Sequence, residues 1–157
     1  MTINPDLQGR SYPAKEVYDV GREKIREFAR AVKATHAAHF EVDAAKALGH
    51  SDLVAPPTFA IIVAQRADAQ LIEDPDSGID FSRVVHADQR FIHHRPIVAG
   101  DRLVAELHVD GVRAMGGGAM ITTRSEIFAV AAGAATDAAR EAVATATSSI
   151  LVRGEGQ

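Results

Sequence analysis

The chain has 157 residues, of which 46% are hydrophobic and 24% charged, with a net charge of −4 and no cysteine. A disulfide, a thiolate zinc site and a cysteine nucleophile are therefore excluded. Because the charge is negative and only 5% of the residues are aromatic, the composition predicts neither a nucleic-acid-binding surface nor one for an anionic membrane. The length predicts one domain with a sizeable core.

The N-terminal third predicts an arm over residues 1–11, a short extended segment over 12–20 and a helix over 21–33. In that helix, apolar residues recur at helical spacing and charged residues occupy the other face, which is typical of a surface helix. We expect no secretory signal. No run reaches the roughly 18 apolar residues that span a bilayer, so we expect a cytoplasmic protein.

A polar loop is expected next, over residues 34–42, followed by a short helical turn over 44–49. Asp43 has the side chain of a typical N-cap for that turn. Gly49 is placed where a left-handed residue ends a helix. The loop carries histidines, which makes it the first candidate for acid–base chemistry.

Pro56 and Pro57 precede an apolar segment over residues 58–72, which we expect to form a buried helix. Proline is suited to a first helical turn, where the N–H groups lack partners inside the helix. Residues 73–78 form a loop. The remaining sequence alternates with period two and is rich in β-branched residues, which predicts strands over residues 83–95, 102–114, 119–131 and 139–152.

This order of elements predicts an α+β fold. An antiparallel sheet with one apolar face needs a cover, and helix 58–72 is the segment large and apolar enough to supply it. We therefore expect the sheet to wrap around this one buried helix. One edge of such a sheet stays unpaired, which favours a dimer formed edge to edge.

Three segments carry a resemblance to a known family: GREKIREFARAV, LVAPPTF and VVHADQRFIHHRPIVAGDRL. In this order and at these spacings they resemble segments of the MaoC-like hot-dog proteins. More closely, the chain resembles the small actinobacterial (3R)-hydroxyacyl-ACP dehydratase subunits and their uncharacterised relatives, over roughly residues 8–152. The resemblance implies a hot-dog fold and a site for an acyl-CoA or acyl-ACP thioester at a dimer interface. The acyl chain would lie beside the central helix.

The resemblance also implies which residues would act. Catalytic members carry Asp-x-Asn-Pro-x-His in the loop after the first helix. The aligned residues here are Ala34-Thr35-His36-Ala37-Ala38-His39. His39 therefore matches the catalytic histidine, while Ala34 stands where the family has its aspartate and His36 where it has asparagine. Half of the catalytic pair is missing.

A second departure concerns the donor to the thioester oxygen. Catalytic members use the N–H of a glycine at the start of the central helix, where this chain has Pro57, which has no N–H. Thr58 is the next available donor. We expect His36, Pro57, Thr58 and Phe59 to line the substrate site.

Each candidate has a structural alternative. His39 could transfer protons or could only cap and pack its loop. His36 could partly replace the missing polar group, although an exposed loop histidine is the simpler interpretation. Asp43 could replace the lost carboxylate, but its predicted role as an N-cap explains it sufficiently.

Three further histidines lie in or next to the first long strand. Adjacent His93 and His94 should face opposite sides, and a strict alternation places His86 on the face of His94 rather than of His93. We therefore expect no metal site. Arg95 should form a structural end to this strand, with a contact to a phosphopantetheine arm as the alternative. Residues 116–118, all glycine, should form a hairpin turn.

Two functions remain open, both without a cofactor. The first is an acyl-thioester-binding member of the (R)-specific hydratase and dehydratase group, weakly active alone or the binding half of a heterodimer with a complete hot-dog subunit. The second is a non-catalytic homodimer that senses or sequesters acyl thioesters. We expect a single hot-dog domain over residues 1–157, with 153–157 as a tail.

Overall fold

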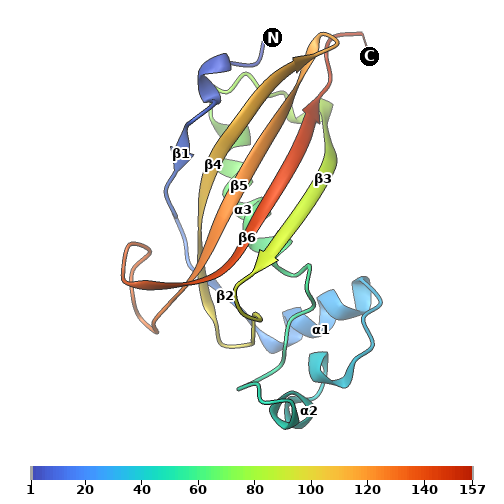
Figure 1. Ribbon diagram of the computed structural model, residues 1–157, viewed down its shortest axis with the longest axis vertical. Helices are drawn as coiled ribbons and strands as arrows, with labels where there is room; N and C mark the ends of the chain where they lie inside the picture. The colour runs from blue at the N-terminus through green and yellow to red at the C-terminus, as the bar shows by residue number, and fades with distance from the viewer. Residues whose placement is uncertain (1, 157) are drawn as a thin grey trace.

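A six-stranded antiparallel sheet curves around one central helix in the computed structural model, which describes residues 2–156 (Figure 1). The strand order is β1-β4-β5-β6-β3, and β2 also pairs with β4. The strands are β1 (Ser11–Tyr12), β2 (Tyr18–Asp19), β3 (Val84–His93), β4 (Arg102–Met115), β5 (Gly118–Val130) and β6 (Arg140–Val152). The helices are α1 (Arg22–Ala31), α2 (Val42–Ala47) and α3 (Ala60–Glu73), with single 3₁₀ turns η1 (Pro5–Leu7), η2 (Ala37–His39) and η3 (Phe81–Arg83).

The predicted α+β architecture is confirmed, and the four long strands end within two residues of their predicted bounds. The predicted N-cap role of Asp43 is wrong. Helix α2 begins earlier, at Val42, with Glu41 at its N-cap, and Asp43 lies inside the first turn. Gly49 does adopt a left-handed conformation, with φ of 92°, as expected for a helix end.

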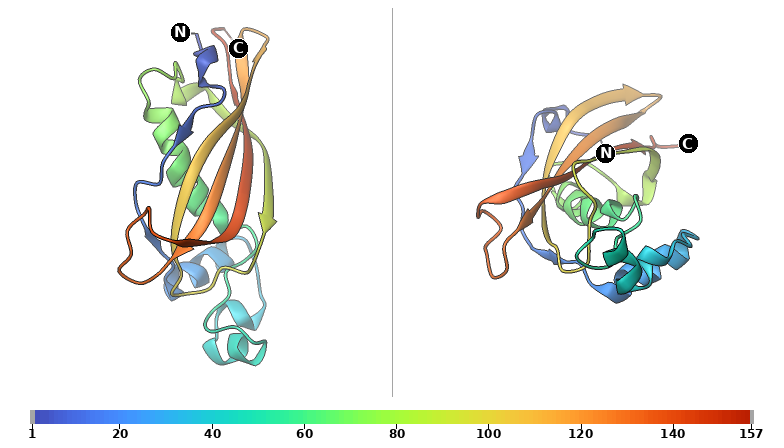
Figure 2. Two further views of the ribbon diagram at one scale, coloured as in Figure 1. Left: turned by 60° about the vertical axis from the view of Figure 1, so that its left-hand side comes forward. Right: turned by 60° about the horizontal axis from the view of Figure 1, so that its bottom comes forward.

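Helix α3 lies in the concave side of the sheet (Figure 2). It begins two residues later than predicted, because Pro57, Thr58 and Phe59 form a separate turn in which the Phe59 N–H donates to Pro56 O at 2.9 Å. Its buried stripe repeats at helical spacing and consists of Ala60, Val63, Ala64, Ala67 and Leu71. Three of these five are alanine, so the helix can approach the sheet closely. Each larger side chain buried there stabilises the fold by roughly 1.5–3 kcal/mol.

Strand β3 is the uncovered edge of the sheet. It pairs with β6 on one side only, and α3 packs against β4, β5 and β6. Three of the six large hydrophobic residues that are exposed within residues 2–156 lie on or just before β3, namely Phe81, Val85 and Ile92. An edge of ten residues without proline or lysine has little protection against pairing with another chain.

The two ends of the molecule differ. Helices α1 and α2 lie at one end, and both chain termini lie with the β4–β5 hairpin at the other (Figure 1). The predicted glycine turn makes that hairpin, since Gly116 and Gly117 have positive φ, and a Cβ on Gly118 would lie 2.1 Å from Val152 O. Within residues 2–156, no helix has the length and apolarity needed to cross a bilayer.

Candidate functional site

The loop after α1 starts with a tight helix end. Lys33 is left-handed, with φ of 60°. Its N–H donates to Arg30 O at 3.2 Å, and the Ala34 N–H donates to Ala29 O at 2.8 Å. This is the hydrogen-bond pattern of a Schellman motif. Ala34, the position at which the resemblance implies an aspartate, is therefore half-buried and held directly against the end of α1.

His36 caps the next turn with its side chain. The Ala38 N–H donates to His36 Nδ1 at 3.1 Å, so this nitrogen carries no proton while the bond exists. In the neutral ring, Nε2 is then the protonated nitrogen. The His36 side chain is exposed, as the simpler of its two interpretations requires, and it forms the start of η2.

His39 is fixed by the segment that precedes α3. Its Nδ1 lies 2.7 Å from Val54 O. A carbonyl oxygen can only accept, so Nδ1 carries the proton and Nε2 keeps a lone pair in the neutral ring. The Val54 N–H donates in return to Ala38 O at 3.1 Å. The ring is half-buried and lies beside His36, with 6.2 Å between the ring centroids.

The start of α3 supplies the second half of the candidate site. Pro57 and Thr58 are exposed in the turn before the helix. The Thr58 N–H makes no hydrogen bond with any part of the chain that the structure describes, so it is free to donate to a bound oxygen. Phe59 is fully buried and packs edge-to-face on Phe28 and Tyr18, with centroids at 5.4 and 6.4 Å. Its ring anchors the helix start in the core.

A salt-bridged turn between β3 and β4 supports this end of the molecule. Arg95 donates to both carboxylate oxygens of Asp101 at 2.8 and 3.0 Å, and to Glu141 at 2.7 Å. These hydrogen bonds raise the pKa of the Arg95 guanidinium. Asp101 also accepts from the Val98 N–H at 2.9 Å. Arg95 is thus fully engaged within the chain, which favours its structural interpretation over a phosphopantetheine contact.

The predicted placement of His86 and His93 on opposite faces is wrong. A bulge between His86 and Asp88 shifts the alternation along β3. His86 pairs with Ile150 and His93 with Ala144 of β6, six residues apart, so His86 and His93 share the inner face. His94 lies beyond β3. Within residues 2–156, no group of three or more His, Cys, Asp or Glu side chains is placed to hold a metal ion.

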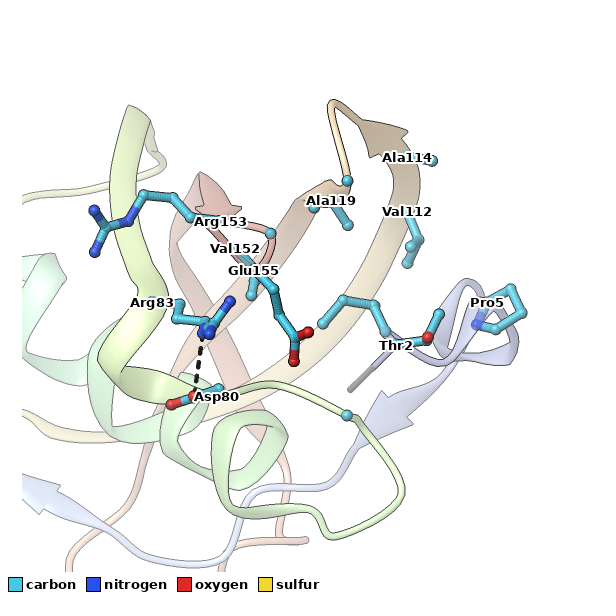
Figure 3. A pocket seen from close by; sticks show the side chains of 15 residues that line it. Thr2, Pro5, Asp80, Arg83, Val112, Ala114, Ala119, Val152, Arg153 and Glu155 are labelled. Carbon is cyan, nitrogen blue, oxygen red and sulfur yellow. Dashed lines mark ion pairs between the residues drawn. The ribbon is translucent and has the colours of Figure 1, made fainter. Parts of the chain in front are cut away.

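A pocket of about 830 Å³ lies at the opposite end of the molecule from α1 and α2 (Figure 3). It opens between η3, the β4–β5 hairpin and the two terminal segments. Asp80 and Arg83 form an ion pair at 3.5 Å on its wall. Four of its fifteen lining residues are glycine, and none is histidine. It is separate from the candidate acid–base site.

Comparisons with solved structures define the class of protein. The chain superposes on a MaoC-like dehydratase with a TM-score of 0.80 at 33% identity, over 94% of this chain and 42% of that one. It superposes on the C-terminally truncated HadBC (3R-hydroxyacyl-ACP dehydratase) complex from Mycobacterium tuberculosis with a TM-score of 0.78 at 35% identity, over 93% and 97% of the two chains. The fold is that of the hot-dog dehydratases, as the resemblance implied.

Sequence comparison then gives the family. The family described as "FAS1-like, dehydratase domain region" matches residues 6–138. A UPF0336 protein of Leifsonia xyli is 52% identical over 153 residues, which are 98% of this chain and 97% of that protein. A UPF0336 protein of Clavibacter michiganensis is 50% identical over 155 residues, 99% of each chain. The chain belongs to the FAS1-like dehydratase-domain family, within the group of actinobacterial UPF0336 proteins.

Proposed function

We propose that this protein binds acyl thioesters as a member of the (R)-specific enoyl hydratase and (3R)-hydroxyacyl dehydratase group with an incomplete acid–base site. It is weakly active alone, or it is the binding subunit of a two-chain dehydratase. The observation that carries this proposal is the anchored His39, whose Nδ1–H donates to Val54 O and whose Nε2 is left as a base.

In this proposal His39 Nε2 takes the C2 proton of a 3-hydroxyacyl thioester, or returns it during hydration. Thr58 N–H is the donor to the thioester oxygen, because Pro57 has no N–H. The exposed His36 lies beside His39. Each of these groups belongs to the end of the molecule where α1 ends and α3 begins.

The missing carboxylate sets the expected rate. Ala34 has no group that could protonate the leaving hydroxyl or position an attacking water. Such general acid–base help is typically worth about 10²–10⁴-fold in rate. A free chain with His39 alone should therefore catalyse slowly, whereas a partner chain with a complete pair would supply the missing residue.

The uncovered β3 edge supports a two-chain assembly. The similar HadBC protein is described as a (3R)-hydroxyacyl-ACP dehydratase complex. In this chain, the edge strand β3 has two exposed hydrophobic side chains, Val85 and Ile92. We propose that β3 pairs with a second hot-dog chain. A neighbouring short gene that encodes Asp-x-Asn-Pro-x-His would favour a heterodimer.

A non-catalytic homodimer that binds acyl thioesters is the second candidate. The alanine at position 34 favours it, because a sensor needs the binding surface but no proton-transfer pair. A lone gene without a complete hot-dog neighbour would support this candidate. Both candidates share the thioester ligand, so activity with and without a partner separates them.

The decisive experiment is the hydration of crotonyl-CoA and dodecenoyl-CoA by the pure protein and by the protein mixed with the complete neighbouring subunit. The pure protein should turn over below about 1 s⁻¹. The mixture should exceed the sum of the two separate chains by at least tenfold. An ordinary enzymatic rate from the pure chain would contradict the incomplete site, and a purely additive mixture would contradict the two-chain dehydratase.

A further inference from the structure

A row of polar side chains crosses the inner face of the sheet halfway along α3. The Thr123 hydroxyl of β5 donates to Asp68 Oδ1 of α3 at 3.2 Å. The Ser148 hydroxyl of β6 donates to Gln89 Oε1 of β3 at 2.5 Å. His86 Nε2 lies 3.2 Å from the same Gln89 oxygen. Thr123 and Ser148 are cross-strand neighbours, as are Ser148 and Gln89, so the row is continuous from α3 to the sheet edge.

This polar row lies beside the part of the sheet that α3 leaves uncovered. On β5 and β6 the inner-facing Thr123 and Ser148 are at most 4% exposed, whereas inner-facing Gln89 and Phe91 of β3 are half-buried and His93 is exposed. A strip of surface therefore runs between α3 and β3. The section of the strip beside Phe91 and His93 is apolar and aromatic, because the Phe91 ring stacks on the His93 ring with 6.1 Å between the ring centroids. This section is called the apolar section below.

Small residues form the floor of this apolar section. The cross-strand partners of Phe91 and His93 are Ala146 and Ala144 of β6. On α3, Ile61 lies seven residues before Asp68 and therefore on the same side of the helix, and its side chain is half-buried. The strip thus begins as an apolar surface near the start of α3 and meets hydrogen-bonding groups further along.

The spacing of residues along α3 and β3 gives the length of each wall up to the polar row. Asp68 lies eight residues after Ala60, which is about 12 Å along a helix. Gln89 lies four residues before His93, which is about 13 Å along a strand. Measured along either wall, the apolar section is therefore roughly 12–13 Å long.

We propose that the polar row ends the acyl-binding strip and restricts this protein to short and medium-chain acyl groups. This inference rests on the proposed thioester function and deepens it by naming the substrate class. An extended alkyl chain with C–C bonds of about 1.5 Å advances roughly 1.3 Å per carbon, so about nine to ten carbons reach the row. The limiting residue is Asp68, with Gln89 opposite it on β3.

Two free-energy terms decide where binding stops improving. Each methylene that leaves water for the apolar section gains about 0.8 kcal/mol. A chain that passes the row must cover polar groups without offering them hydrogen bonds, which costs about 1–3 kcal/mol per group. Burial raises the pKa of Asp68 to about 6, against the opposing effects of Thr123 and His86, so at pH 7 the group is mostly ionised and costlier to cover.

The test is calorimetric binding of saturated acyl-CoA thioesters with 4, 8, 12 and 16 carbons, each below its micelle concentration, to the wild type, Asp68→Leu, Asp68→Asn and Glu73→Leu. Glu73 is an exposed acid on the same helix, so Glu73→Leu removes one negative charge away from the strip. Circular dichroism of every variant checks that the fold is kept.

Wild-type affinity should rise at least tenfold from 4 to 8 carbons and then stay level or fall at 12 and 16. Asp68→Leu should bind the two longer chains at least tenfold more tightly, with 4-carbon binding unchanged. Asp68→Asn should give a smaller gain and Glu73→Leu none. The length limit is overturned if wild-type affinity keeps rising up to 16 carbons. It is also overturned if Asp68→Leu binds the longer chains no more tightly than the wild type does. Absence of binding at every length contradicts the proposed thioester function as well.

Discussion

At the scale of single residues, His39 has the most defined chemistry, because one ring nitrogen is committed to Val54 O and the other is left as a base. We expect His39→Ala to lower any hydration rate at least 10²-fold and to change the free energy of unfolding only slightly, since the ring is half-buried. Coupled measurement of enoyl-CoA hydration and urea unfolding checks both expectations.

His36→Ala is the matched control for this prediction. It removes a histidine three residues away together with the cap to the Ala38 N–H, so it should cost up to about 1 kcal/mol of stability and less activity than His39→Ala. Ala34→Asp should raise the rate, because it restores the carboxylate of the catalytic loop. An unchanged rate in His39→Ala would mean that the site was assigned wrongly.

Asp68 makes a separate prediction about the pH dependence of stability. Its pKa is raised to about 6 in the folded chain, first by burial, against about 3.9 in an unfolded chain. Between these values the folded state binds the proton that the unfolded state has lost. The stability contributed by the protonated form is therefore fully present below about pH 4 and is lost as the pH rises through about 6.

Asp68→Asn isolates this contribution, because the amide oxygen can still accept from Thr123 and no longer titrates. The variant should gain on the order of 1–2 kcal/mol relative to the wild type when the pH rises from 4 to 7, less than a fully buried group because Asp68 keeps some solvent contact. Urea unfolding at both pH values measures the difference. A pH-independent difference would show that Asp68 ionises normally.

At the scale of elements, the end of α1 is built around an unusual residue. Lys33 is the one non-glycine residue with positive φ within residues 2–156. This backbone conformation is strained for any residue with a Cβ atom, and glycine has none. Lys33→Gly should therefore stabilise the fold by about 0.5–1 kcal/mol. Thermal unfolding compares it with Glu27→Gly, an exposed position inside the same helix, which should lose about 1 kcal/mol.

The two glycine variants separate backbone conformation from the removal of a charged side chain. If both destabilise the protein equally, the left-handed conformation of Lys33 carries no strain. The comparison also bears on the site, because the Lys33 turn places Ala34 and the loop that leads to His39.

At the scale of the whole molecule, the backbone of β3 predicts how the protein associates. The His94 N–H donates to Val143 O of β6, and neighbouring residues of a strand point their backbone groups to opposite sides. The N–H groups of Gln89, Phe91 and His93 therefore face the free edge. In a dimer paired through β3, these three amides should exchange with solvent at least tenfold more slowly than in a monomer.

Light scattering at micromolar concentration gives the molar mass, and hydrogen exchange followed over a dilution series tests the edge itself. Protection of the three amides should fall as the protein dissociates. A dimer in which they exchange as fast as loop amides would place the interface elsewhere, and a strict monomer would contradict the proposed assembly. The amide of Val104 in the middle of the sheet is the internal control.

Local pattern was sufficient for most of the fold. Period-two alternation located the long strands, and helical spacing located α1 and α3, because these signals depend only on which side chains face water. The resemblance then gave the hot-dog class and pointed to His39. Local pattern failed at Asp43 and at the faces of His86 and His93, since neither the true start of α2 nor the bulge in β3 leaves a clear local signal.

The sequence by itself determined the architecture, the family and the absence of an aspartate at position 34, because patterning and residue identity are properties of the chain. Only the tertiary structure decided which nitrogen of His39 is the base, because that depends on a carbonyl fifteen residues away. It alone also joined Asp68 to Thr123, which are 55 residues apart. Contacts between distant segments arise from tertiary packing. These contacts set the hydrogen-bond partners and the burial of each side chain, and therefore its chemistry, whereas the sequence gives only its identity.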